Sequence, residues 1–150
     1  MKFTLRRACR EDLEDLDNLY TENMRPLVER VAVWDPDRFR RDYQPQDFSV
    51  VEVAGCTAGL AKIVIGAEDI YIAEIQIQEM YRGRGIGNKL MQEVIALSEA
   101  TGKRLWFRVV KDNPAKGFYE KYGFIPFRET ATHWQMERVP AQSTMQRPVV

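Results

Sequence analysis

Cysteine and histidine are scarce in this chain, whose 150 residues include two cysteines and one histidine. Cys9 and Cys56 lie far apart in the sequence and belong to no Cys/His cluster with metal-binding spacing. We therefore interpret both as reduced structural thiols and expect no metal site.

Long apolar runs and an excess of either charge are also absent. No stretch reaches the roughly 18 uninterrupted apolar residues of a membrane helix, and the start turns acidic where a secretory signal would be apolar. Lys plus Arg and Asp plus Glu both number 22, so no broad field attracts a nucleic-acid backbone or an acidic membrane. These absences predict a cytoplasmic protein with no nucleic acid and no membrane as partner.

The size and composition of the chain are typical of one globular domain. Apolar residues make up 45% and charged residues 29%, which is ordinary for a soluble fold of this length. We predict a single domain over residues 1–139. The remaining segment, 140–150, reads "PAQSTMQRPVV"; it is polar, holds two prolines and predicts a flexible tail.

The first third of the chain predicts a strand followed by helices. "FTLRRA" alternates in polarity and indicates a strand, and Leu13, Leu16 and Leu19 then recur at helical spacing among carboxylates. Prolines divide residues 23–47, which we interpret as two short helices joined by a loop.

The sequence then changes to β-branched runs. "FSVVEVA", "GLAKIVI" and "IYIAEIQI", separated by "GCT" and "GAED", predict three antiparallel strands in a meander. The meander is followed by a helix that ends at Gly102 and by the strand "LWFRVV". A short helix closed by Gly123 and a final strand pair, "IPFRET" and "THWQMERV", come next. This order predicts an α/β or α+β fold with helices on both faces of a sheet.

Three glycines stand among basic residues in "YRGRGIGNK", between the meander and the next helix. Glycine permits positive φ and close approach of a ligand, and a helix start presents unpaired N–H groups at the positive end of its dipole. These features predict an anion cradle, in which the charges of Arg82, Arg84 and Lys89 stay unpaired until the anion binds. Taken alone, a three-glycine segment of this kind is more often a basic turn that binds nothing.

The spacing of these glycines argues against two common nucleotide loops. A nucleotide-triphosphate loop requires Gly-Lys-Ser/Thr, whereas Gly87 is followed by Asn88. A dinucleotide fingerprint runs G-x-G-x-x-G, and from Gly83 the third glycine comes one residue early.

The segment Arg82–Gly87 is similar to the Arg/Gln-x-x-Gly-x-Gly/Ala signature of the GCN5-related N-acetyltransferase (GNAT) superfamily, and "NPAKGFYEKYGF" resembles that family's second motif. The likeness extends from about Val50 to Met136. It implies the acyl-CoA N-acyltransferase fold, a mixed and mostly antiparallel sheet splayed between its fourth and fifth strands. It also implies acetyl-CoA as the acetyl donor.

The resemblance further implies which residues bind the donor. The pantetheine arm maps to the strand backbone at Ile75, Gln76 and Ile77, and the diphosphate maps to the loop residues Arg82, Gly83, Arg84, Gly85, Ile86, Gly87 and Asn88. A polar contact from Asn113 is also implied, although Asn113 precedes Tyr119 by six positions instead of the commoner seven. Asn113 could equally cap the helix before Pro114.

Two residues are candidates for catalysis. The resemblance implies that Tyr119 meets the departing thiolate. Because a phenol has a pKa near ~10 and a thiol near ~8.5, a hydrogen bond to the thiolate is favoured over full proton transfer. Tyr119 also belongs to an aromatic patch, and such patches usually pack in the core. Glu74 is our candidate for the base that takes the amine proton. Inside an apolar strand its carboxylate either faces the cleft or pairs with an arginine such as Arg108.

Three further residues are candidates for the acceptor site. His133 lies in or before the last strand, where a hydrogen-bonded structural role is the alternative. Trp34 and Tyr43 lie in the segment without a motif, and core packing explains them equally well.

The sequence thus predicts an acetyl-CoA-dependent N-acetyltransferase that acts on a primary amine of a small molecule, peptide or protein by direct attack in a ternary complex. The alternative is a non-catalytic module that binds coenzyme A as a sensor or scaffold. A homodimer built on exposed sheet edges is compatible with either function.

Overall fold

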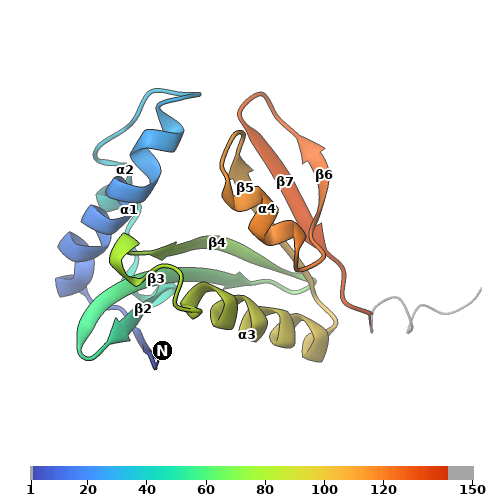
Figure 1. The fold of residues 1–150 in the computed structure, drawn as a ribbon, viewed down its shortest axis with the longest axis horizontal. Coiled ribbons are helices and arrows are strands. Elements are labelled where there is room, and N and C mark those ends of the chain that lie inside the picture. Colours follow the sequence, from blue (N-terminus) through green and yellow to red (C-terminus); the bar gives the residue numbers. More distant parts are fainter. Residues whose placement is uncertain (1, 142–150) are drawn as a thin grey trace, which may run out of the picture. The chain divides into compact units, whose positions relative to one another are not determined.

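The computed structural model describes residues 2–141, and the chain forms two compact units (Figure 1). The first unit comprises the residues up to Ile63 together with Ala73–Lys89, and the second comprises Val64–Ile72 together with the residues from Leu90 on. Strand β3 (Cys56–Ile65), strand β4 (Asp69–Ile77) and helix α3 (Ile86–Thr101) contribute to both units. That the two units form one domain over residues 1–139 stays a prediction.

The first unit is built on antiparallel strands. Strand β1 (Thr4–Arg7) pairs with β2 (Phe48–Val53), which pairs in turn with β3 (Cys56–Ile65). Helices α1 (Leu13–Val28) and α2 (Arg38–Asp42) accompany these strands. The core of this unit joins α1 to the sheet through side chains that are almost fully buried: Ala8, Leu16, Leu19, Phe48, Val50 and Leu60.

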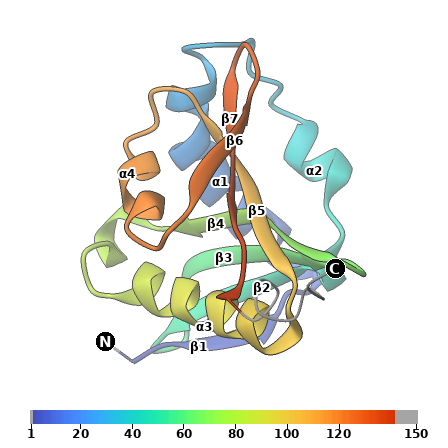
Figure 2. The same ribbon diagram turned by 90° about the vertical axis from the view of Figure 1, so that its right-hand side faces the viewer.

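The second unit contains the parallel pair of the sheet. The first residues of β4 run parallel to β5 (Arg104–Val110), and the paired residues are Asp69–Tyr71 with Arg104–Trp106. Figure 2 shows β6 (Ile125–Glu129) and β7 (His133–Arg138) as a hairpin beside β5, to which β7 is antiparallel. Helix α4 (Ala115–Glu120) connects β5 to β6.

The sheet order is β1-β2-β3-β4-β5-β7-β6. The predicted fold class, a mixed and mostly antiparallel sheet with helices, is therefore confirmed, as are the three-stranded meander and the final strand pair. The predicted end of α3 is also confirmed, because Gly102 follows its last residue and has a positive φ of 71°. Helix α4 ends earlier than predicted, at Glu120, and Gly123, with a φ of 88°, closes the turn that follows it. Pairing of β4 with β5 stops at Tyr71, so the ladder joins only the beginning of β4 to its parallel neighbour.

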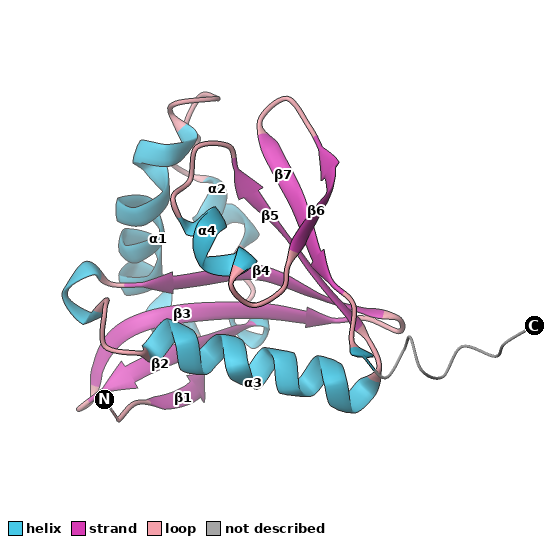
Figure 3. Cartoon of the chain, turned by 45° about the vertical axis from the view of Figure 1, so that its right-hand side comes forward, coloured by secondary structure: helices cyan, strands magenta, loops and turns pink. Residues whose placement is uncertain are grey.

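The prediction of two short helices within residues 23–47 is wrong for its first half. Helix α1 continues through Pro26 to Val28 as one helix of 16 residues (Figure 3). Half-buried Asn23 and Leu27 extend the inward face that begins at Leu16, so the helical spacing persists beyond the proline. Because Pro26 lies in the last turn, the hydrogen bond that it removes is lost close to the helix end.

The end of the described chain differs from the predicted tail at one residue. Pro140, where the tail was expected to begin, has a buried side chain. Residues 142–150 of that predicted tail lie outside the described residues. Within residues 2–141, no helix has both the length and the apolar character that crossing a membrane requires.

Candidate active site

The glycine loop lies between a short 3-10 helix, Glu79–Tyr81, and the start of α3. Gly83 and Gly85 have positive φ of 73° and 86°, a backbone region that other residues rarely adopt. A Cβ built at either glycine would meet no atom within 4 Å. Backbone conformation, and not crowding by neighbouring atoms, therefore explains both glycines, and the surface above them is open to a ligand.

The start of α3 provides the donors that an anion needs. The Lys89 N–H donates to the Gly85 carbonyl at 3.0 Å and closes the first turn. The N–H groups of Ile86 and Gly87 precede that bond, at the positive end of a helix of 16 residues. Ile86 is buried and fixes the helix start, whereas Arg84 is exposed. The residues present therefore fit a diphosphate.

The expectation that the basic side chains stay unpaired before an anion binds is wrong for Arg82. Its guanidinium Nε donates to the Ile77 carbonyl at 3.1 Å, and its Nη2 donates to Asn23 Oδ1 at 2.7 Å. The Lys89 ammonium lies 5.8 Å from the centre of the Phe3 ring. Arg82 and Lys89, which the sequence predicted to pair with the anion, thus already contact other side chains or backbone of the first unit.

The strand segment predicted to hold the pantetheine arm forms the end of β4, where Ile75, Gln76 and Ile77 are half-buried. Gly59 on β3 lets the β4 backbone approach, because a Cβ there would lie 2.6 Å from the Gln76 carbonyl oxygen. The Ile77 carbonyl accepts from Asn23 Nδ2 at 3.1 Å as well as from Arg82. Side chains of the protein therefore already use the last carbonyl of this segment.

Glu74 is a half-buried carboxylate without a close cationic partner among the contacts of the first unit. Its Oε2 accepts a hydrogen bond from Gln76 Nε2 at 2.9 Å. Burial raises the pKa of Glu74 to about 7, against the opposing influence of the Gln76 hydrogen bond and the more distant charges of Lys62 and Arg38. A carboxyl group with this pKa exchanges protons readily near neutral pH, as a general base must. Arg108, the alternative partner, is exposed on β5 in the second unit.

Tyr119 and Asn113 lie in the second unit, so their positions are described there alone. The half-buried Tyr119 ring packs 4.2 Å from Phe107 between centroids, in a cluster that includes Phe118 and Phe124. Asn113 Oδ1 accepts the Ala115 N–H at 2.9 Å in the turn that leads into α4. The structure thus gives both residues the contacts that their structural alternatives required.

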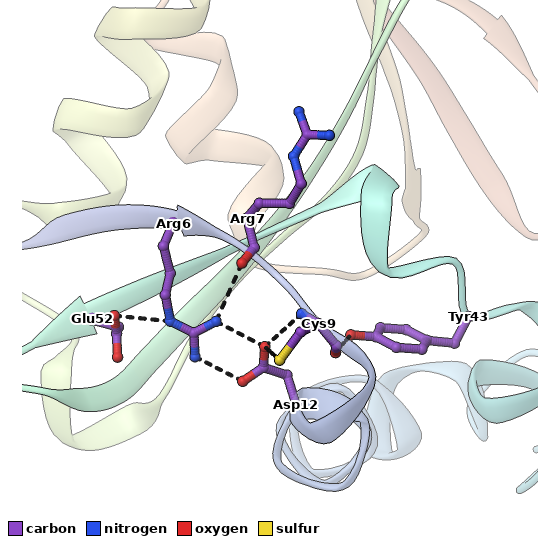
Figure 4. Close-up of polar contacts among 6 residues, drawn as sticks. All are labelled: Arg6, Arg7, Cys9, Asp12, Tyr43 and Glu52. Carbon is purple, nitrogen blue, oxygen red and sulfur yellow. Dashed lines mark hydrogen bonds and ion pairs between the residues drawn. The ribbon is translucent and has the colours of Figure 1, made fainter.

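The three acceptor-site candidates have different surroundings. His133 begins β7, where its Nδ1 lies 2.6 Å from Thr132 Oγ1. Tyr43 packs against the core of the first unit and donates its hydroxyl to the Cys9 carbonyl at 2.7 Å (Figure 4). Trp34 lines a pocket formed by α1, α2 and their connection, and its buried Nε1 has no hydrogen-bond partner among the described residues. Of the two aromatic candidates, Trp34 thus lines a pocket, whereas Tyr43 packs on the core.

Asn23 is the site residue that the sequence did not reveal. It joins Arg82 of the glycine loop to Gln76 of β4. The available signal was a polar residue on the inward face of α1, three to four positions after Leu19 and Tyr20. Within residues 2–141, no group of three or more His, Cys, Asp or Glu side chains is arranged to hold a metal ion.

The chain belongs to the acetyltransferase (GNAT) family, whose model matches residues 13–124. A Bacillus subtilis (strain 168) protein, named as a candidate ribosomal protein bS18-alanine N-acetyltransferase, is 31% identical over 119 residues, which cover 76% of this chain and 77% of that protein. Family membership thus rests on sequence over most of the chain.

Solved structures share the fold. The Thermoplasma acidophilum PaiA N-acetyltransferase in complex with coenzyme A has a TM-score of 0.74 at 18% identity, covering 93% of this chain and 99% of that one. The ribosomal-protein-S18-alanine N-acetyltransferase of Escherichia coli has a TM-score of 0.70 at 18% identity, covering 92% of this chain and 94% of that one. At these identities the likeness shows the fold alone.

Proposed function

We propose that this protein is an acetyl-CoA-dependent N-acetyltransferase that acetylates a primary amine by direct attack in a ternary complex. One arrangement within the first unit carries the proposal. Strand β4 bears a carboxyl group with a pKa of about 7 and leads through a short turn into an open, glycine-rich helix start. A base and an anion cradle thus follow one another on one continuous segment.

The donor would be held mainly by backbone. The loop from Gly83 to Asn88 would receive the diphosphate, since the two αL glycines leave its surface open and α3 aims its dipole there. Arg84 would add charge from an exposed position. Arg82 would act indirectly, because its guanidinium is held by Ile77 and Asn23. Backbone of Ile75 and Gln76 would hold the pantetheine arm.

Acetyl-CoA supplies an acetyl group activated as a thioester. Ionised Glu74 would accept a proton from the ammonium form of the acceptor, which leaves a neutral amine able to attack. An N–C bond then forms, the C–S bond breaks, and the remaining amine proton balances the thiolate charge. Tyr119, in the second unit, would stabilise that charge through its hydroxyl; this role rests on the resemblance of "NPAKGFYEKYGF" to the family's second motif.

We further propose that the acceptor is the α-amino group of an alanine at a protein N-terminus. The names of the Bacillus subtilis relative and the Escherichia coli structure support this acceptor class. The pocket beside Trp34 would take part of the acceptor chain, because the buried indole N–H could donate to a peptide carbonyl. A ribosomal acceptor would also place the enzyme in the cytoplasm.

Calorimetric titration with acetyl-CoA, coenzyme A and NADH tests the donor site first. We expect saturable binding of both coenzyme A forms and none of NADH. Gly85→Glu should weaken acetyl-CoA binding at least about 100-fold, because a side chain and a negative charge would occupy the place of the diphosphate. Gly55→Glu is the matched control, since Gly55 also has positive φ (80°) and open space but lies in the β2–β3 turn.

Turnover is tested separately by thiol release. A peptide that begins with alanine should release coenzyme A, and the same peptide with a blocked N-terminus should not. Equal affinity in the folded Gly85→Glu and Gly55→Glu variants would reject the cradle. Binding without turnover on any amine would leave only a coenzyme A-binding module.

A further inference from the structure

We propose that Asn23 is a positioning residue, which orients the Gln76 amide so that its NH2 group faces Glu74 and so keeps the general base ready to accept a proton. The inference rests on the function proposed for Glu74. Asn23 belongs to α1, whereas Glu74 and Gln76 belong to β4.

A continuous chain of hydrogen bonds carries the inference. Arg82 Nη2 donates to Asn23 Oδ1 at 2.7 Å, Asn23 Nδ2 donates to Gln76 Oε1 at 3.0 Å, and Gln76 Nε2 donates to Glu74 Oε2 at 2.9 Å. All four side chains lie in the first unit. The chain therefore connects the glycine loop to the carboxylate through two amides.

The chemistry of the end residue fixes the direction of every bond. Arginine has donors and no acceptor, so Asn23 must turn its oxygen toward Arg82 and its NH2 group toward β4. Gln76 must then accept with Oε1, which leaves its own NH2 group for Glu74. The second Asn23 bond, to the Ile77 carbonyl at 3.1 Å, fits only this orientation.

The direction of the last bond matters because it decides which form of Glu74 is favoured. An amide N–H stabilises the carboxylate, whereas an amide oxygen in the same place would accept from the protonated acid. An amide can present either end after a half-turn about its terminal bond. Without Asn23, Gln76 would lose the donor that selects one end.

Other charged groups around Glu74 act from farther away. Lys62 of β3 and Arg38 of α2 lower the pKa of Glu74. The Gln76 hydrogen bond lowers it more than either charge and is the largest influence against the increase that burial causes. Asn23 thus controls the strongest local support for the ionised base without touching that base. This is why we call it a positioning residue and not a catalytic one.

The test compares Asn23→Leu with the wild-type chain by ¹³C NMR of the glutamate carboxyl groups, with the Glu74 signal assigned from its loss in Glu74→Gln. We expect Asn23→Leu to raise the pKa of Glu74 by about one unit. The midpoint of the acid limb in the pH profile of kcat should move to higher pH by the same amount. Turnover should therefore be about tenfold slower below the pKa and equal to the wild-type rate well above it. Glu22→Gln, at the exposed neighbouring position, is the control and should change neither readout.

A second pair of variants separates positioning from general disturbance. Gln76→Leu should raise the pKa of Glu74 by itself, and adding Asn23→Leu to it should raise the pKa no further. If Asn23→Leu does not fold, as judged by circular dichroism, Asn23→Ala takes its place with less steric demand.

An unchanged Glu74 pKa in the folded Asn23 variant would overturn the inference. The inference would also fail if Asn23→Leu raised the pKa of Glu74 equally in the wild-type chain and in the Gln76→Leu variant. The NMR titration needs no turnover, so these results stand apart from the proposed function, which fails instead if Glu74→Gln keeps the wild-type rate.

Discussion

Asp12 and Glu74 are both shielded carboxyl groups of the first unit, yet their surroundings shift their pKa values in opposite directions. Asp12 accepts two hydrogen bonds from the Arg6 guanidinium at 2.8 and 2.7 Å, and its Oδ2 also accepts the Cys9 N–H at 2.8 Å (Figure 4). The Arg6 bonds, ahead of the Cys9 bonds, hold the pKa of Asp12 well below its usual range despite burial. Glu74 has one neutral donor, and burial raises its pKa to about 7.

The difference fits a structural role for Asp12 and the proton-transfer role that we propose for Glu74. A carboxylate held by a bidentate cation stays ionised at any ordinary pH. Because Arg6 also donates to Glu52 at 3.0 Å, the same arginine connects β1, β2 and the start of α1. A carboxylate supported only by an amide and distant charges stays close to protonation. The first arrangement stabilises the fold, and the second keeps a proton exchangeable.

Glu74→Gln should give the largest effect and should change activity without loss of stability. Removing a general base typically costs 100-fold or more in turnover, so we expect kcat to fall by at least about 100-fold. The folded-state pKa of Glu74 lies above its unfolded value, so stability falls as pH rises from about 4.5 through about 7. Above pH 7 the glutamine removes this penalty, for which one pKa unit corresponds to about 1.4 kcal/mol and the upper bound is about 3 kcal/mol.

Steady-state kinetics and urea unfolding at pH 5 and pH 8 measure both parts of this prediction. The stability gain should be close to its full size at pH 8 and much smaller at pH 5. A variant that is less stable than the wild type at pH 8 would show that Glu74 is a structural carboxylate, and the contrast with Asp12 would fail.

Asp12→Asn should give the opposite pattern, with reduced stability and unchanged kcat. The change removes the charge on which the Arg6 bonds depend, and hydrogen bonds to charged groups contribute about 1.5–3 kcal/mol, so we expect a loss of about 2 kcal/mol at pH 7. Because the folded-state pKa of Asp12 is depressed, the stabilisation is present above the unfolded value of about 4 and is lost as pH falls below it.

Urea midpoints at pH 7 and pH 3 check this prediction, with Asp15→Asn as the matched control. Asp15 is exposed in the first turn of α1, so its loss should cost no more than about 0.5 kcal/mol. The difference between Asp12→Asn and the wild type should shrink at pH 3. A difference of equal size at both pH values would mean that shape, and not charge, makes the Asp12 contacts stabilising.

The contrast between the two carboxylates could be predicted from the sequence only in part. Alternating patterns identified the strands and Glu74 as a strand carboxylate, and the glycines among basic residues identified the loop, because those features depend on neighbours in the chain. The partners of Glu74 come from distant segments, with Asn23 lying 53 positions from Gln76. Arg82 shows the same limit, since its place in a basic glycine loop predicted an anion contact while its actual partners include a side chain 59 positions away.

The path of α1 past Pro26 explains why Asn23 was missed. A proline inside a helical pattern favours a break, and a break there would place Asn23 at a frayed helix end. Packing of Leu16 and Leu19 on the sheet, with half-buried Leu27 farther along the same face, instead favours a helix that continues past Pro26. The side chain of Asn23 is consequently fixed over the end of β4, where only the folded chain reveals its partners.

Lys62→Met should give the smallest effect and tests whether distant charge is a weak substitute for the direct cation at Asp12. The ammonium of Lys62 lies 5.4 Å from the centre of the Phe48 ring and lowers the pKa of Glu74 from a distance. Removing the charge while keeping the stem should raise that pKa by about half a unit, and turnover at pH 6 should fall roughly threefold. Lys62→Arg keeps the charge and should retain the wild-type profile. If Lys62→Met shifted the acid limb as far as Asn23→Leu, long-range charge and not the oriented Gln76 amide would be the main support of the ionised base, and the ordering of influences on Glu74 would have to be reversed.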